Sequence, residues 1–142
     1  MIRATPEQIA EGWDLVRPLI AKALPPTVAI DSESMTNVLY SLLEEESQLW
    51  IYYENLDRTN ALGVVVTVIM NEPVSKARYL LVYTTTAIAP TTKEDYEKGL
   101  DTLRSFAEAN DCSQVIAYVE NDARVRQLLA IGGVKVSTIV RL

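Results

Sequence analysis

The chain has 142 residues, of which 49% are hydrophobic and 23% are charged, and its formal net charge at pH 7 is −6. This size and balance predict one globular domain over residues 1–142 and exclude a disordered chain, while the scattered lysines and arginines make nucleic acid an unexpected partner. Because the sequence has one cysteine and no histidine, it excludes an internal disulfide, a histidine-based triad and a multi-cysteine or histidine metal site, so no metal is expected.

Two helices are expected in the first third of the chain. Residues Thr5–Gln8 supply a hydroxyl cap, a proline at the first helical position and a glutamine at the third. This helix ends at Pro25–Pro26, and a second one follows Asp31 or Ser32 and closes in the acidic run Glu44–Glu46. Acids at a helix C-terminus oppose the dipole, so we expect that end to fray or to be paired elsewhere. The predicted inward faces are Ile9, Trp13, Val16 and Ile20, then Met35, Val38, Leu39, Leu42 and Leu43.

Three strands follow, over Gln48–Glu54, Leu62–Met70 and Arg78–Ile88. Leu62–Met70 is apolar on both faces, which is typical of a central strand. The connections are too short for crossovers, so the three strands are expected to form an antiparallel meander. The longest apolar run, Ala61–Met70, is about half the roughly 20 residues of a membrane helix, and no signal peptide is visible. We therefore expect no membrane partner and a soluble, cytoplasmic protein.

A long helix interrupts the series of strands. Thr91–Asn110 is predicted to be helical, with Thr91 and Glu94 as its capping box. A short strand over Gln114–Val119 comes after this helix. Because a helix connects them, we expect this strand to pair with Arg78–Ile88 in parallel, by a right-handed crossover.

The last twenty-two residues carry a distinct pattern. Asn121 can cap a short helix whose apolar residues Val125, Leu128 and Ile131 share one face. Gly132–Gly133 can stop that helix with a positive φ. The alternating run that follows predicts a final strand, with Val134, Val136, Thr138 and Val140 on one face.

A capped helix, a glycine stop and a closing strand resemble the C-terminal end of the GNAT superfamily of N-acetyltransferases. The order β-α-α-β-β-β-α-β-α-β resembles the same superfamily over essentially the whole chain. The resemblance implies an α/β fold with a mixed, mostly antiparallel sheet and helices on both faces. It also implies that the strands Arg78–Ile88 and Gln114–Val119 splay apart to admit the pantetheine arm of acetyl-CoA, with the pyrophosphate on the N-terminus of the long helix.

The residues at this implied site depart from the family's pattern. The loop over residues 89–99 has no glycine before its last position, although glycines let the backbone close on phosphate oxygens. Glu94 and Asp95 occupy the first helical turn, where their negative charges already compensate the helix dipole and would repel a pyrophosphate. The family's proton-donating tyrosine is replaced by Leu128, or by Leu129 if the register slips by one. These departures predict a degenerate active site and no cofactor.

Two functions remain open at this point. The first is a catalytically degenerate acetyltransferase-like domain that binds proteins, self-assembles or serves as a structural component. Its expected contacts are the edges Tyr79–Ile88 and Gln114–Val119 and the final strand. The C-terminal end also looks like that of acetyltransferase-like internal virion proteins of tailed bacteriophages, which implies a phage protein that can enter a virion.

The alternative is an active acetyl-CoA-dependent N-acetyltransferase with an atypical phosphate-binding loop. The backbone N–H groups of that loop and a lysine would then meet the coenzyme, and a carboxylate or a tyrosine would manage protons. The candidate cofactor-binding residues are Thr91, Thr92, Lys93 and Asn121. The candidate catalytic residues are Glu120, Tyr83 and Tyr118.

Overall fold

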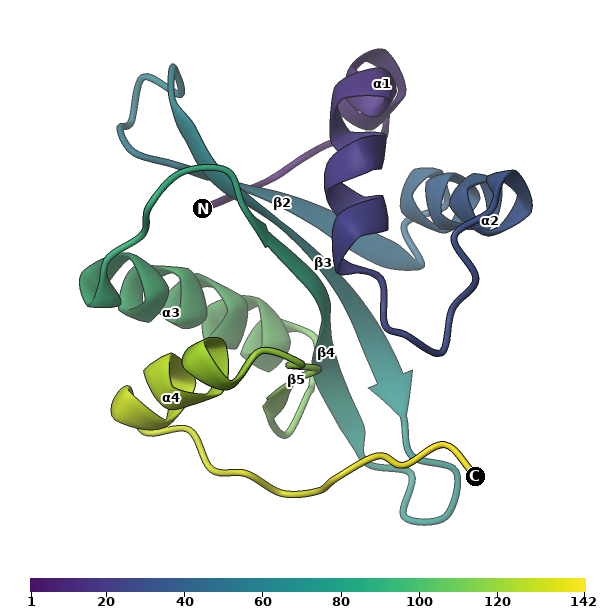
Figure 1. The fold of residues 1–142 in the computed structure, drawn as a ribbon, viewed down its shortest axis with the longest axis vertical. Helices are drawn as coiled ribbons and strands as arrows, with labels where there is room; N and C mark the ends of the chain where they lie inside the picture. The colour runs from purple at the N-terminus through teal and green to yellow at the C-terminus, as the bar shows by residue number, and fades with distance from the viewer.

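The computed structural model describes residues 1–142 and contains five strands and four helices (Figure 1). None of the helices combines the length and the apolar character needed to cross a membrane. In chain order the elements are β1 (Ile2–Arg3), α1 (Pro6–Ala23), α2 (Ser32–Leu43), β2 (Ser47–Tyr53), β3 (Ala61–Asn71), β4 (Arg78–Ala87), α3 (Lys93–Ala109), β5 (Val115–Ala117) and α4 (Asp122–Ala130).

The strands form one sheet in the order β1-β2-β3-β4-β5. The first four pair antiparallel, and the expected meander of β2, β3 and β4 is therefore confirmed. β5 follows the crossover helix α3 and pairs with β4 in parallel, as predicted. The open sheet has β1 at one edge and β5 at the other.

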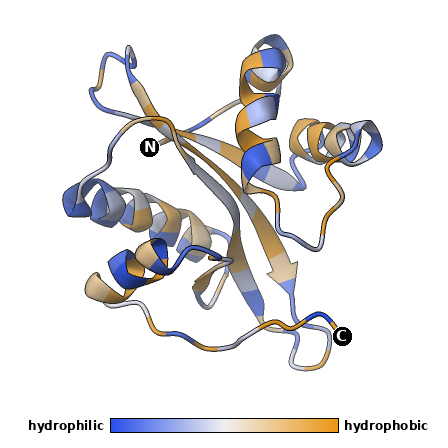
Figure 2. Cartoon of the chain, viewed as in Figure 1, coloured by the Kyte–Doolittle hydropathy of each residue, from blue (hydrophilic) through white to orange (hydrophobic).

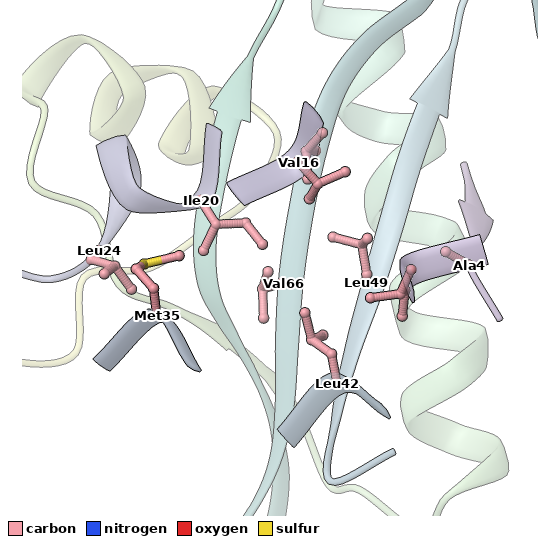
Figure 3. Close-up of a cluster of buried hydrophobic side chains, with 10 residues drawn as sticks. Ala4, Val16, Ile20, Leu24, Met35, Leu42, Leu49 and Val66 are labelled. Atoms are coloured by element: carbon pink, nitrogen blue, oxygen red, sulfur yellow. The ribbon is translucent and has the colours of Figure 1, made fainter. Parts of the chain in front are cut away.

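Helices cover both faces of the sheet, with α1 and α2 on one side and α3 and α4 on the other (Figure 1). Alternate residues of the central strand, β3, point to opposite faces of the sheet. Val64 and Val66 belong to the core beneath α1 and α2, whereas Val65 belongs to the core beneath α3. Figure 2 shows hydrophobic residues concentrated on the strands and on the helix faces turned toward them. The first core, drawn in Figure 3, contains Ala4, Ile9, Val16, Ile20, Leu24, Met35, Leu42, Leu49, Val64 and Val66.

The helix starts follow local side-chain chemistry. Thr5 and Gln8 form the predicted capping box at α1, and the Asp31 carboxylate accepts from the Ser34 N–H at 2.7 Å at the start of α2. The acidic C-terminal end of α2 has a partner in β1, because Arg3 and Glu45 form an ion pair at 2.7 Å. This contact ties the first strand to the turn before β2.

The predicted final strand is wrong. Residues 134–142 form no strand and take part in no hydrogen bond. The helix stop before them is confirmed, because Gly132 has a φ of +93° and the Gly133 N–H bonds to the Leu128 carbonyl at 2.9 Å. Alternating side chains define the two faces of a strand, but a strand also needs a neighbour for its backbone groups, and this segment has none.

Candidate functional site

β4 and β5 pair over only a short distance. The pairing runs from Leu80 opposite Val115 to Val82 opposite Ala117. The Tyr118 N–H donates the last bond of this ladder to the Val82 carbonyl, at 3.1 Å. Beyond it, β4 continues for five residues with β3 as its only neighbour. A gap therefore separates β4 from the chain that follows β5.

A bulge in β4 lies where the gap begins. On β3, Thr67 opposes Val82 and the preceding Val66 opposes Thr84, so Tyr83 is an extra residue in β4. A bulge bends its strand and increases the local twist, and such irregularities are common beside functional sites. The register shift thus accounts for the end of the β4–β5 pairing.

The side chain of Arg124 reaches β4 from α4. Its Nη1 donates to the Thr85 carbonyl at 2.8 Å, in a part-buried contact. The Ile88 N–H bonds to the Leu62 carbonyl on the β3 side, so alternation turns the backbone groups of Thr85 and Ala87 toward the gap. An extended ligand or an added strand would use these groups, and Arg124 already holds one of them.

The N-terminus of α3 is closed by its own side chains. The Thr92 hydroxyl accepts from the Asp95 N–H at 3.2 Å, and the Asp95 carboxylate accepts from the Thr92 N–H at 2.7 Å. The Tyr52 hydroxyl, from β2, donates to the other carboxylate oxygen of Asp95 at 2.9 Å. Helix N-termini attract anions through the dipole and unpaired N–H groups. Asp95 is the anion that fills this role here.

The predicted capping box of Thr91 and Glu94 is wrong by one residue. Thr92 is the N-cap, and Asp95 is the third residue of the helix. Both pairs have the same spacing, but the Asp95 carboxylate has a second donor in Tyr52, whereas Glu94 pairs along the surface with Lys98 at 2.8 Å. The two possible capping boxes are equivalent in spacing, and the one that forms is the one whose carboxylate also contacts Tyr52 on β2.

The surroundings of Asp95 shift its pKa downward. The Thr92 backbone N–H is the largest cause, and the hydroxyls of Thr92 and Tyr52 add to it against the opposing effect of desolvation. Burial, followed by the hydrogen bond to Asp95, raises the pKa of Tyr52 from 10.0 to about 12. The pair is thus held as a carboxylate and a neutral phenol at neutral pH.

We expect Asp95→Asn to destabilise the fold by about 1 kcal/mol at neutral pH, because the charged cap is lost. A lowered pKa stabilises the fold above the ordinary aspartate value of about 3.9, and this contribution is lost as the pH falls through the native value. Urea unfolding at several pH values should therefore show the two proteins converging at acid pH. Glu94→Gln, with the same change of charge one residue away, is the control and should have a smaller effect. Equal effects of the two substitutions would contradict the assignment.

The Tyr52 phenol should ionise late in an alkaline titration followed by ultraviolet absorbance. Because its pKa is raised, the associated stability is complete below about 10 and is lost as the pH rises toward about 12. Tyr52→Phe should remove the last phase of the titration and leave the earlier phases in place. A titration without such a late phase in the native protein would contradict the Tyr52–Asp95 contact.

The structure gives most of the predicted cofactor-binding residues other partners. Thr92 is the N-cap of α3, and the Nζ of the adjacent Lys93 lies 3.6 Å from a carboxylate oxygen of Glu97. The Asn121 amide oxygen caps α4 by accepting from two backbone N–H groups, at 2.8 and 3.3 Å. Thr91 is half-buried and makes no side-chain hydrogen bond. The roles of Thr92 and Asn121 are the ordinary ones of N-cap residues.

Two of the predicted catalytic residues lie together. The rings of Tyr83 and Tyr118 have centroids 6.3 Å apart and are tilted by 58°. Burial, and then the neighbouring Tyr118, raises the pKa of Tyr83, which moves it further from the neutral range in which a general acid works best. Glu120 is exposed and has no hydrogen bond or ion pair, and Leu128 lies half-buried on α4. The catalytic role of these residues stays a prediction.

Two residues of the site have no functional signal in the sequence. Tyr52 lies within the predicted strand Gln48–Glu54, and Arg124 lies within the short helix that Asn121 caps. Their partners, Asp95 and Thr85, lie 43 and 39 residues away, so no local spacing signals either contact. Only the pair Thr92 and Asp95 has a spacing that the sequence displays.

Two surface hollows lie away from the gap. One, of about 470 Å³, lies between the end of α1 and the start of α2, and the other, of about 390 Å³, lies beside β1, β2 and the start of α1. Neither is lined by residues of β4, β5, α3 or α4. No cluster of three or more cysteine, aspartate or glutamate side chains is placed to hold a metal ion.

A bulged β4, a parallel β5 that diverges from it and a helix start beside the gap define an acetyltransferase-type α/β fold. The chain has the GNAT fold, as its solved neighbours show. A GNAT family acetyltransferase from Staphylococcus aureus subsp. aureus has a TM-score of 0.66 at 13% identity, over 99% of this chain and 95% of that one. No protein-family model and no curated protein sequence matches the chain.

Two further solved structures have the same arrangement. A predicted acetyltransferase from Clostridium acetobutylicum, solved with acetyl-CoA, has a TM-score of 0.68 at 17% identity and covers 99% of this chain and 93% of that one. The ribosomal-protein-alanine N-acetyltransferase from Brucella melitensis biovar Abortus has a TM-score of 0.64 at 16% identity, over 99% and 98% of the two chains. At these identities the likeness establishes the fold, and the site must be judged from its own residues.

Proposed function

We propose that this chain is a catalytically degenerate acetyltransferase-like domain that acts as a protein-binding or structural component. The observation that carries the proposal is the Asp95 carboxylate on the N-terminus of α3, held by Thr92 and Tyr52. A pyrophosphate placed there would meet a fixed negative charge where binding needs positive potential. Lys93, the only cation in the first turn of α3, is paired with Glu97. The residues at the start of α3 therefore do not fit the donor.

The same scaffold supports contacts with other chains. The sheet has a short edge strand, β5, and a gap toward which the backbone groups of Ala87 are turned, whereas the Thr85 carbonyl already accepts from Arg124. Such edges accept an added strand from another polypeptide. We further propose that this partner lies within a virion, and the resemblance of the C-terminal end to internal virion proteins of tailed phages supports that setting. Mass spectrometry of purified virions tests that setting, and absence of the chain from them would contradict it.

Calorimetric titration with acetyl-CoA tests the absence of a donor site. We expect no binding heat up to millimolar acetyl-CoA, because the helix start is already neutralised by Asp95. Affinity in the micromolar range would overturn the proposal. Asp95→Asn, measured alongside, shows whether the carboxylate is the cause, since removal of its charge should then make any donor binding stronger than in the native chain.

One observation favours an active acetyl-CoA-dependent N-acetyltransferase as the second candidate. The gap beside β4 is present, and the N–H groups of Lys93 and Glu94 in the first turn of α3 have no partner within the protein. In that case donor binding should be weakened by Lys93→Glu, which reverses the one positive charge in the first turn. Titration of the native chain and of Lys93→Glu distinguishes the two candidates, because the degenerate domain shows no binding in either.

A further inference from the structure

Residues 134–142, called the tail here, have the pattern of a strand but no partner. Val134, Val136 and Val140 share one face of the extended chain and are strongly exposed, with Val136 at 75% and Val140 at 70%. No hydrogen bond in the structure involves any residue of the tail. Figure 2 shows hydrophobic residues recurring along it. Exposed apolar segments of this kind mark contact surfaces.

The outer edge of β5 also lacks a neighbouring strand. The Gln114 carbonyl and the Tyr118 N–H both bond to β4, so alternation turns the backbone groups of Val115 and Ala117 away from β4. No other strand of the sheet lies on that side. β5 therefore presents unpaired N–H and C=O groups, which is the template that an added strand requires.

The chain's own tail does not pair with this edge, and its exit is set by the end of α4. The Gly132 and Gly133 N–H groups bond to the carbonyls of Leu129 and Leu128, at 3.1 and 2.9 Å. These two bonds form the Schellman closure of the helix, and a Cβ on Gly133 would lie only 2.7 Å from the Leu128 oxygen. The exit of the tail is thus fixed, and from it the tail extends to the opposite side of the molecule (Figure 1).

Charge favours a second copy of this chain as the partner. Both charged side chains of the tail, Lys135 and Arg141, are positive, whereas all 19 acidic side chains lie in residues 1–133. Glu120 and Asp122 are exposed next to the end of β5. A tail docked on another copy would therefore bring positive charge toward these two carboxylates. Extended at roughly 3.3 Å per residue, it is also long enough to cover a three-residue strand.

We infer that the tail adds as a strand to the free edge of β5 in a second copy of this chain. Exchange in both directions gives a closed dimer with two identical contacts, and the tail leaves each copy at Gly132–Gly133. The inference rests on the proposed function and names its partner as the chain itself. It uses the tail and β5, whereas the absence of donor binding rests on α3, so the two can fail separately.

Sedimentation velocity over a range of protein concentrations tests the inference. The native chain should form a dimer, and Val136→Asp should weaken its self-association by about tenfold or more, because it places a charge on the apolar face. Ser137→Asp adds the same charge on the opposite face and is the matched control, expected to change the association by less than about threefold. Both positions are exposed, so neither substitution should disturb the fold.

Hydrogen exchange locates the contact. The Val115 and Ala117 amides should be protected in the native dimer and lose that protection in Val136→Asp. A monomer at every concentration would overturn the inference, as would a dimer equally stable in the two variants. Protection of these amides in a monomer would also overturn it, because the tail would then pair within its own chain. None of these results bears on the titration with acetyl-CoA.

Discussion

Leu80→Ala should destabilise the protein by about 2–5 kcal/mol, the cost of a cavity in a packed core. Leu80 is 0% exposed and belongs to the core beneath α3, with Trp50, Val65 and Leu103. It also lies on β4 opposite Val115, where the only parallel pairing of the sheet begins. The cavity would therefore loosen both the helix layer and the strand that borders the gap.

Urea unfolding measures this effect, with a lower midpoint and an unchanged slope as the expected result. Leu129→Ala removes the same atoms from α4 at a position that is 45% exposed, and it should change stability by no more than about 0.5 kcal/mol. Similar losses in the two variants would contradict the placement of Leu80 at the centre of the second core.

Thr67→Val should have the next largest effect, about 1–3 kcal/mol for each buried polar group left without a partner. The Thr67 hydroxyl, 0% exposed, accepts from the Trp50 indole N–H at 2.9 Å and donates to the Gln48 side-chain oxygen at 2.8 Å. The three side chains link β2 to β3 inside the protein. Valine preserves the shape and removes both bonds.

The same substitution one strand away is the control. Thr84, on β4, is 3% exposed and makes no side-chain hydrogen bond, so Thr84→Val should change stability by less than about 1 kcal/mol. Chemical denaturation compares the two variants, and the NMR signal of the Trp50 indole N–H should move in Thr67→Val alone. Equal losses of stability would show that the hydrogen bonds of Thr67 contribute little.

The helices and strands were largely predictable because their signals are local. Thr5 and Asp31 cap α1 and α2 as the sequence indicates, and the apolar run of β3 occupies the centre of the sheet. The parallel pairing of β5 followed from the length of its connection to β4. In each case the residues that determine the structure lie within one helix or strand, or within one connection between two strands.

The errors arose where the outcome depends on distant partners. The sequence offers two capping boxes of equal spacing at α3, and the one the structure adopts, with Asp95, also contacts Tyr52 on β2. The contact between Arg124 and Thr85 joins α4 to β4 and has no local pattern. The tail has strand periodicity, yet its pairing depends on which edge is within reach. Periodicity alone therefore could not place residues 134–142.

The central claim is that the start of α3 and the gap beside β4 accept no acyl donor. Amide NMR spectra recorded during titration with acetyl-CoA test it residue by residue. We predict that the amides of Lys93, Glu94 and Thr85 stay unchanged, because Asp95 neutralises the helix start and Arg124 occupies the strand edge. Saturable shifts of these three amides at micromolar acetyl-CoA would contradict the account.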